Sequence, residues 1–238
     1  MQEVRTSRTH KIEKDMTSEV HNIDCLEYMR TLPDNYFQLA IADPPYGLIE
    51  SGVQTRGGAG KLKGRILNES EKKFDRWDKA PSKEFFDELM RVCENVIIWG
   101  GNYFNLPPSR CVVAWDKCQP WPNFSQIELA WTSFDYPAKL YKFDNRTNDK
   151  IHPTQKPVDL YAYCLQQFAK DGDRIFDPMM GSQSSRIAAY KLGFDYVGCE
   201  LDKEYFDKGC ERFDRECHGI TATPSGTKYQ QTSILDII

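Results

Sequence analysis

Residues 40–47 combine a short apolar strand with groups that could hold an amine. The run is Ala-Ile-Ala-Asp-Pro-Pro-Tyr-Gly, so the strand ends in the carboxylate of Asp43, two prolines and an aromatic ring. Pro44 and Pro45 each fix φ and restrict the residue before them, which keeps Asp43 extended. The Asp43 carboxylate and the Pro44 carbonyl are acceptors, and Tyr46 could cover the flat face of a group that donates to them. This set suits the exocyclic amino group of a nucleobase, although two prolines alone would equally fit an ordinary turn.

Residues 174–200 carry a second set of groups with a recognisable spacing. A predicted strand ends at Asp177, a turn and a helix follow, and the next predicted strand ends on Glu200. The turn contains Pro178, Gly181 and Ser182. Glu200 stands 19 residues after Gly181, and an acid placed there at a strand end can accept both hydroxyls of a ribose.

The turn differs from a pyrophosphate-binding loop, because it has one glycine where such loops have three. The carboxylate of Asp177 also favours a ligand with an amine or a positive charge over a phosphate. S-adenosylmethionine has an ammonium, a sulfonium and a ribose, so we predict it as the cofactor. A structural βαβ unit whose acids only cap helices is the alternative, and the presence of both Asp177 and Glu200 disfavours it.

Apolar patterns place both sets in an α/β domain. Strands are predicted at residues 19–23, 37–42, 96–99, 111–115, 127–131, 174–177 and 195–199, and helical faces at 26–32, 85–93, 160–168 and 184–192. Strands linked by helices form a parallel sheet, whose ligands bind beyond the carboxyl ends of the strands. Asp43 and Asp177 both stand at such ends, so we expect them to open onto one shared cleft.

Two segments are candidates for contact with nucleic acid. Residues 48–80 lack periodicity, and between 56 and 65 they carry four positive charges and no negative one, at Arg56, Lys61, Lys63 and Arg65. A long loop of this kind is usually functional or disordered, and its place after Asp43 favours a mobile flap that meets phosphates. Residues 134–150 are the second segment and a candidate for target recognition, with basic side chains at Lys139, Lys142 and Arg146.

Composition limits the classes of function. The 238 residues fit one catalytic domain, and the formal net charge of −4 excludes a broadly basic surface, so phosphate contacts must come from a local patch. The eight cysteines are dispersed without Cys-x-x-Cys pairs or a histidine cluster, which argues against a metal site. No long apolar run suggests a membrane span, so we expect reduced thiols and a cytoplasmic protein.

Five motifs in order resemble the amino-group DNA methyltransferases. They are Asp24-Cys25-Leu26-Glu27 and residues 43–47, 152–157, 176–182 and 197–202. The catalytic half precedes the cofactor half, as in the permuted β class, and residues 98–104, 115–117 and 128–131 are similar to compact phage-type members. The likeness covers about residues 20–217. It implies a Rossmann-like, mostly parallel seven-stranded sheet with S-adenosylmethionine across its carboxyl edge.

The resemblance also implies roles for individual residues. Asp43, Pro44, Pro45 and Tyr46 would hold a target base flipped out of double-stranded DNA. Asp177 would meet the methionine amino group of the cofactor and Glu200 its ribose, beside the turn of Pro178, Gly181 and Ser182. His152, Thr154 and Lys156 would hold the methionine carboxylate, and Asp24 or Cys25 would lie near the cofactor adenine.

Several alternatives stay open at this point. An aspartate opens the catalytic motif, which in the resembling family favours adenine N6 over cytosine N4. Gln183 stands where the family usually has a second glycine, so a non-catalytic binder of DNA or cofactor is the competing reading. We divide the chain into an arm at 1–17, a catalytic domain at 18–217 and a tail at 218–238. Sequence specificity could come from the 48–80 loop or from the second subunit of a homodimer, and a role in restriction protection, host regulation or a virus is not distinguished.

Overall fold

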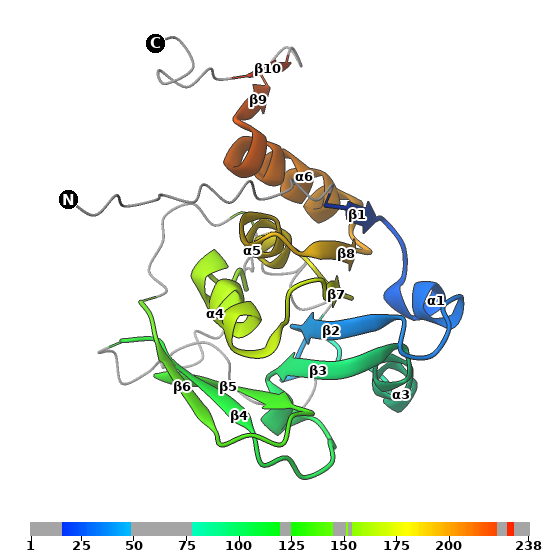
Figure 1. Cartoon of the computed structure of the whole chain (residues 1–238), viewed down its shortest axis with the longest axis vertical. Coiled ribbons are helices and arrows are strands. Elements are labelled where there is room, and N and C mark those ends of the chain that lie inside the picture. The colour runs from blue at the N-terminus through cyan, green and yellow to red at the C-terminus, as the bar shows by residue number, and fades with distance from the viewer. Residues whose placement is uncertain are drawn as a thin grey trace, which may run out of the picture.

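The computed structural model describes residues 16–48, 78–119, 125–144, 151, 154–222 and 228–230. Its centre is an eight-stranded sheet with the strand order β1-β8-β7-β2-β3-β5-β4-β6 (Figure 1). The α/β prediction is therefore confirmed, with one strand more than the seven that the resemblance implies. The additional strand consists of residues 139–142.

The elements have the following bounds. The strands are β1 (Ser18–His21), β2 (Phe37–Ala42), β3 (Cys93–Trp99), β4 (Val112–Asp116), β5 (Ile127–Thr132), β6 (Lys139–Lys142), β7 (Arg174–Asp177), β8 (Asp195–Cys199), β9 (Ile220–Ala222) and β10 (Lys228–Gln230). The helices are α1 (Cys25–Arg30), α3 (Lys83–Val92), the short 3-10 turn η1 (Gly101–Tyr103), α4 (Val158–Phe168), α5 (Ser184–Leu192) and α6 (Lys203–His218).

One strand of the sheet, β5, runs in the direction opposite to its neighbours. The neighbours β1, β8, β7, β2 and β3 are all parallel to one another. β5 lies antiparallel to both β3 and β4, and β6 is parallel to β4. Because β5 runs in the opposite direction, its first residues lie at the same edge of the sheet as the last residues of β2 and β3.

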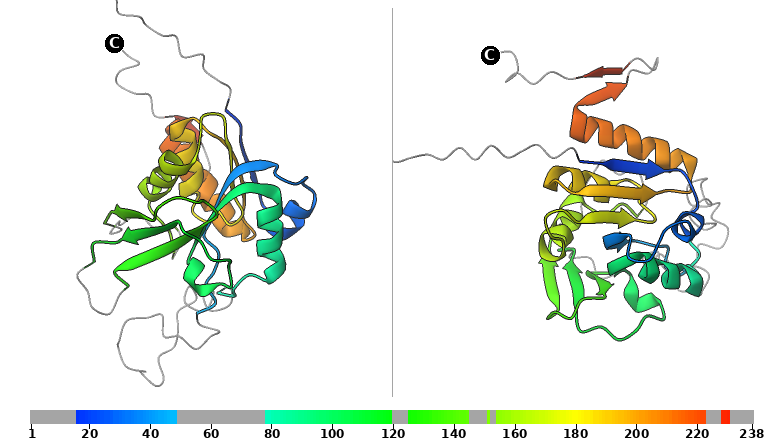
Figure 2. Two further views of the ribbon diagram at one scale, coloured as in Figure 1. Left: turned by 60° about the horizontal axis from the view of Figure 1, so that its bottom comes forward. Right: turned by 45° about the vertical axis from the view of Figure 1, so that its right-hand side comes forward.

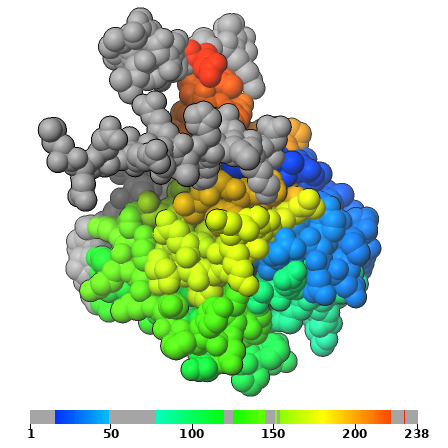
Figure 3. All heavy atoms as spheres, viewed as in Figure 1, coloured from blue at the N-terminus to red at the C-terminus, as the bar shows by residue number. Residues whose placement is uncertain are grey.

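Helices cover both faces of the sheet, and the residues of β2 alternate between the two cores. Leu39 and Ile41 pack with side chains of α4 and α5, whereas Ala40 and Ala42 pack with side chains of α1 and α3. This is the period of two that a strand buried on both faces requires. Figures 1 and 2 show these two pairs of helices on opposite faces of the sheet. The space-filling view shows residues after 150 lying against both the N-terminal part and the β4–β6 part, so these segments form one body (Figure 3).

The adjacent strands β2 and β7 form a switch point in the topology. Ala40 pairs with Phe176 across this boundary. The helix α5 that follows β7 covers one face of the sheet, and the helix α3 that follows β2 covers the other. Ligands of open α/β sheets bind where the connections diverge in this way, at the carboxyl ends of the strands.

α6 is a long helix that the apolar patterns do not predict, because most of its residues are charged. Asp202 caps its first turn by accepting hydrogen bonds from the amides of Glu204 and Tyr205, and Gly219 ends it in the left-handed conformation with φ 65°. The buried Phe213 faces α5, and beyond the helix β9 pairs with β10 away from the main sheet (Figure 2). The last residues of the predicted tail, 231–238, lie outside the described residues.

The candidate recognition segment at 134–150 contains a strand that the polar composition concealed. β6 pairs with β4 at the end of the sheet, and its Tyr141 stacks on Tyr163 of α4 with ring centroids 4.4 Å apart. Lys139 and Lys142 lie on this strand, and lysines are common on edge strands because they oppose pairing with another chain. Leu140 is 66% exposed. A contact of this segment with DNA stays a prediction.

Other predicted properties concern cysteines, metals and membranes. Five of the eight cysteines are buried and all eight are free. Over the ranges with described coordinates, no group of three or more His, Cys, Asp or Glu side chains is arranged to hold a metal ion. None of the helices described in these ranges combines the length and apolar character that crossing a membrane requires.

Candidate active site

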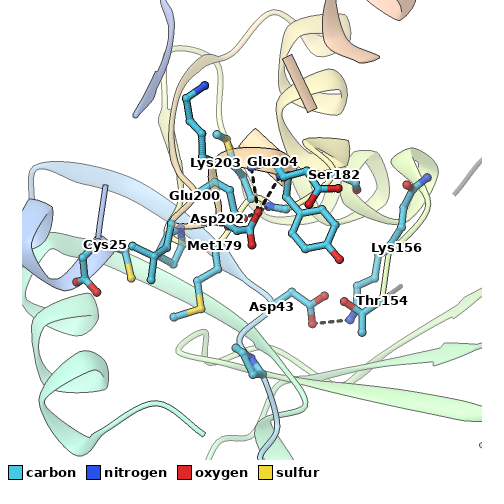
Figure 4. A pocket seen from close by; sticks show the side chains of 18 of the residues that line it. Cys25, Asp43, Thr154, Lys156, Met179, Ser182, Glu200, Asp202, Lys203 and Glu204 are labelled. Atoms are coloured by element: carbon cyan, nitrogen blue, oxygen red, sulfur yellow. Dashed lines mark hydrogen bonds and ion pairs between the residues drawn. The ribbon is translucent and has the colours of Figure 1, made fainter. Parts of the chain in front are cut away.

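A cavity of about 690 Å³ lies at the carboxyl ends of β2, β7 and β8 (Figure 4). This volume is typical of sites for small molecules and cofactors. Its lining includes these predicted residues: Asp24, Cys25, Asp43, Pro45, Thr154, Lys156, Pro178, Gly181, Ser182 and Glu200. The tip of β2 and the turn after β7 therefore open onto one shared space, as the strand-end argument predicts.

Asp43 presents its two carboxylate oxygens to different surroundings. Oδ1 accepts a hydrogen bond from Nζ of Lys156 at 2.5 Å (Figure 4). It accepts a second one from the hydroxyl of Tyr46 at 3.0 Å. Oδ2 has no hydrogen-bond partner within the described ranges, and it is not among the enclosed unpaired atoms. Burial raises the pKa of the Asp43 carboxyl, although the Lys156 ammonium lowers it. One oxygen is thus fixed by the protein while the other is open to a donor in the cavity.

Tyr46 is held tightly beside Asp43. Its hydroxyl hydrogen-bonds to Glu128 of β5 as well as to Asp43, and its ring stacks on Tyr103 with centroids 5.1 Å apart. Gly100 approaches the ring so closely that an added Cβ would lie 2.3 Å from Cε1 of Tyr46, and its φ is +68°. Only glycine satisfies both conditions at this position.

Lys156 lines the cavity, and its ammonium is already bound to groups around Asp43. Its ammonium contacts Asp43 and Glu128, with the second distance 2.8 Å, and the side chain is only 5% exposed. An ammonium has three hydrogens, and the hydroxyl of Tyr46 at 3.1 Å is the third acceptor in reach. The predicted contact with a methionine carboxylate would have to replace one of these three.

Glu200 organises the far side of the cavity. Its Oε2 accepts from the amide of Gly181 at 3.0 Å and its Oε1 from the amide of Asp202 at 2.7 Å. Burial raises the pKa of Glu200, and these two amide donors lower it. The carboxylate joins the turn after β7 to the residues after β8, and it lines the cavity where a ribose is predicted.

Asp177 lies beneath the cavity and is not part of its lining. The side chain is 1% exposed, with Oδ2 accepting from the hydroxyl of Ser185 at 2.5 Å and Oδ1 from the amide of Met179 at 3.0 Å. Burial raises the pKa of Asp177 to about 7, although both donors favour the ionised form. Pro178 and Met179, the next two residues, line the cavity in its place, and the contact of Asp177 with an amino group of the cofactor stays a prediction.

Gln183 shows how the chain accommodates a residue in place of the expected glycine. Its φ is 60°, the left-handed conformation that favours glycine. The side chain is fully buried under α6, where Oε1 accepts from Arg186 at 2.9 Å and Nε2 contacts the carbonyl of Phe206 at 3.3 Å. Gln183 is absent from the lining of the cavity, so its side chain does not occupy the space predicted for the cofactor.

The space for Gln183 depends on Gly209, and this pairing predicts a stability effect. A Cβ at Gly209 would lie 2.7 Å from both Cγ and Nε2 of Gln183. We expect Gly209→Ala to lower the free energy of unfolding by about 1–3 kcal/mol, as overpacking of a filled core does. Urea unfolding measures the change. Adding Gln183→Gly should restore part of the loss, and additive effects of the two substitutions would contradict the pairing.

Arg212 of α6 supports the same turn from below. Its Nη1 donates to the carbonyl of Ser182 at 2.9 Å and to the hydroxyl of Ser184 at 2.8 Å, and its Nε donates to Glu216 at 2.7 Å. Buried arginines with several acceptors hold loops rigidly, because each donor has a fixed direction. α6 therefore fixes the backbone of the turn that lines the cavity.

Comparisons with known proteins agree with this geometry. Residues 98–211 match the family model described as DNA methylase, for N6 and N4 methylation. A curated relative is the type II methyltransferase M.HinfI of Haemophilus influenzae, which is 24% identical in an alignment that covers 81% of this chain and 67% of that protein. The chain belongs to the amino-group DNA methyltransferases.

Two solved structures are similar in fold to this methyltransferase. The M1.HpyAVI–SAM complex has a TM-score of 0.52 and 19% identity, and the match covers 82% of this chain and 98% of that one. The PvuII DNA methyltransferase, described as cytosine-N4-specific, has a TM-score of 0.55 and 14% identity, with 84% and 93% covered. S-adenosylmethionine is the methyl donor of the family.

Two charged residues of the methyltransferase's site escaped prediction. Glu128 and Lys117 were noted only as parts of motifs shared with compact members of the family. Glu128 contacts Lys156 and Tyr46, and Lys117 contacts Glu128 at 2.6 Å. The one usable signal was that both stand at ends of predicted strands.

Not every predicted residue can be placed. His152, Arg56, Lys61, Lys63, Arg65 and Arg146 of the methyltransferase lie outside the described residues. Asp24 lines the cavity and also caps α1, where its Oδ1 accepts from the amides of Leu26 and Glu27. The position of Asp24 is thus compatible both with a contact to the cofactor and with a purely structural role as a helix cap.

Proposed function

We propose that the chain methylates the exocyclic N6 amine of adenine in double-stranded DNA, with S-adenosylmethionine as the methyl donor. The observation that supports this most is the cavity shared by Asp43 and the turn of Gly181 and Ser182. It brings an acceptor suited to an amine next to a turn and an acid suited to a nucleoside cofactor. We expect the reaction to take place in the cytoplasm of a bacterial or phage-infected cell.

The amine would be held by Asp43 and Pro44. The open Oδ2 of Asp43 accepts one of its hydrogens and the Pro44 carbonyl the other. Two such acceptors favour a more tetrahedral nitrogen, so that its lone pair leaves the ring and points at the methyl group. The bound cofactor supplies a methyl group on a positively charged sulfur. Alignment then accounts for much of the rate.

An adenine inside a duplex cannot reach this cavity, so we infer that it is flipped out at a cost of a few kcal/mol. Tyr46, with Tyr103 stacked beside it, offers aromatic surface next to Asp43. On the cofactor side, Glu200 would take the ribose, Thr154 would contribute to the methionine carboxylate, and Asp24 or Cys25 would lie near the cofactor adenine. Asp177 would act there through the turn that it supports.

Nucleoside analysis separates adenine from cytosine methylation. DNA incubated with the protein and S-adenosylmethionine is digested to nucleosides and examined by mass spectrometry, with a reaction lacking the methyl donor as control. We expect N6-methyladenine, because an aspartate opens the catalytic motif. Finding N4-methylcytosine alone would show that the substrate class is wrong while the family chemistry is right.

A non-catalytic role is the competing proposal, and it was motivated by Gln183. The buried position of this side chain under α6, outside the lining of the cavity, argues against an obstructed cofactor site. Isothermal titration with S-adenosylmethionine tests this directly. Absence of binding at millimolar cofactor would favour the non-catalytic role.

A further inference from the structure

A charged cluster surrounds Oδ1 of Asp43, and its members Asp43 and Lys156 line the cavity. The Lys156 ammonium stands 2.5 Å from Asp43, 2.8 Å from Glu128 and 3.1 Å from the Tyr46 hydroxyl. Lys117 stands 2.6 Å from the other oxygen of Glu128. Two carboxylates and two ammonium groups therefore balance their charges in a place that is largely shielded from water.

Glu128 is the branching point of this cluster. Its Oε1 pairs with the Lys156 ammonium and accepts a hydrogen bond from the Tyr46 hydroxyl. Its Oε2 pairs with the Lys117 ammonium. The side chain is 14% exposed and does not line the cavity. Burial raises the pKa of Glu128, but Lys156 and Lys117 together lower it to about 2, so it is ionised at neutral pH. Glu128 thus contacts both groups that hold Oδ1 of Asp43.

Removal of the charge on Glu128 would weaken the contacts that hold Lys156 and Tyr46 in place. Lys156 would lose one of its two anionic partners. In Glu128→Gln a single uncharged amide oxygen would also have to serve Lys156, Tyr46 and Lys117, which now share two carboxylate oxygens. Lys156 and Tyr46 would then depend more on Oδ1 of Asp43, whose orientation sets the direction of the open Oδ2. A displacement of about 1 Å at a reacting group can cost about 10²-fold in rate.

We infer that Glu128 is a positioning residue for methyl transfer, which acts through Lys156 and Tyr46 to aim the open oxygen of Asp43 at the substrate amine. This inference rests on the proposed function. Sites of this kind need support from neighbours that fix the rotamers of the reacting groups. Buried ion pairs seldom add net stability over apolar packing, so a purely structural role explains this four-charge cluster poorly.

The pH dependence of the reaction offers a readout that simple damage to the fold would not produce. Asp43 faces Lys156, Glu128 and Tyr46, and Asp177 and Tyr161 also interact with its charge. The negative charge of Glu128 raises the pKa of the Asp43 carboxyl. In Glu128→Gln this effect is absent, so Asp43 should stay ionised to a lower pH than in the wild type.

The test compares Glu128→Gln with Glu128→Asp, which keeps the charge, and with Glu88→Gln as a matched control. Glu88 forms an ion pair of 2.7 Å with Arg91 on α3 and does not line the cavity. For Glu128→Gln we expect kcat to fall by about 10²-fold while the Kd of S-adenosylmethionine changes less than about threefold. The acid limb of its kcat profile should move to lower pH. Glu128→Asp should keep the wild-type acid limb, and Glu88→Gln should match the wild type in all respects.

Two outcomes would overturn the inference. One is an unchanged kcat in Glu128→Gln, and the other is a fall in kcat with weakened cofactor binding and an unmoved acid limb. If Glu128→Gln does not fold, Lys117→Gln tests the cluster from its other end, with an expected fall of roughly tenfold in kcat, and no fall there would also overturn it. A wild-type protein that methylates no DNA contradicts the proposed function instead, and NMR titration of Asp43 would still report the influence of Glu128.

Discussion

Asp43→Ala is expected to lower the rate of methyl transfer by about 10³-fold and to change the affinity for S-adenosylmethionine by less than about threefold. Loss of a single well-placed hydrogen-bonding group in an active site typically costs 10²–10³ in kcat. Here the substitution removes the acceptor for the amine and also a shared partner of Lys156 and Tyr46. Single-turnover kinetics on DNA, with calorimetry for the cofactor, measure the two quantities separately.

The control for Asp43→Ala is Asp34→Ala, which removes an exposed carboxylate that pairs with Arg91 at 2.8 Å. Exposed ion pairs contribute little, so rate and cofactor affinity should stay at wild-type values. If Asp43→Ala abolishes cofactor binding, Asp43 belongs to the cofactor site instead of the base site. A rate within tenfold of wild type would show that the amine is held by other groups.

The second large effect concerns stability and pH. The pKa of Asp177 rises from 3.8 in an exposed chain to about 7 in the folded protein, chiefly through burial. Between these values the folded state binds a proton that the unfolded state has released, so the free energy of unfolding falls as pH rises from about 4 to about 7. The fall levels off above pH 7, and its upper bound is roughly 4 kcal/mol at 1.36 kcal/mol for each pKa unit.

Asp177→Asn removes the titratable group at this position and keeps the shape of the side chain. The amide oxygen can accept from Met179, and the amide nitrogen can donate to Ser185. Urea unfolding without cofactor at pH 4.5, 6 and 8 should show the variant gaining on the wild type by a few kcal/mol as pH rises. Asp171→Asn, at an exposed position on the preceding turn, is the control for loss of charge. Parallel curves for wild type and Asp177→Asn would contradict the raised pKa.

The sequence was enough to predict those strands and helices whose bounds depend on a local pattern of apolar residues. Strands at 37–42 and 195–199 and a helix at 184–192 have the predicted bounds, because their apolar runs end at charged, proline or glycine residues. The shared cavity also followed from the sequence, since the carboxyl ends of neighbouring parallel strands meet at one edge. A charged helix such as α6 and a lysine-bearing strand such as β6 lack such a pattern.

Contacts between charged side chains were beyond the reach of the sequence. Lys156 and Asp43 are 113 positions apart, and nothing in either motif indicates that the lysine turns to the aspartate. The antiparallel course of β5 brings Glu128 to the same edge, and the direction of one strand is not encoded in its own apolar pattern. The burial of Asp177 could not be predicted for a related reason, because it depends on the hydrogen-bond partners Met179 and Ser185.

The fit of Gln183 against Gly209 has a consequence for exchanging parts among related enzymes. A chimaera that takes the cofactor turn from a relative with glycine at position 183, but retains this α6, would contain an unfilled hole beneath the helix. The reverse graft, which retains Gln183 and imports a helix with a larger residue at position 209, would be overfilled. Turn and helix therefore have to be transplanted together, although 26 positions separate these two residues in the chain.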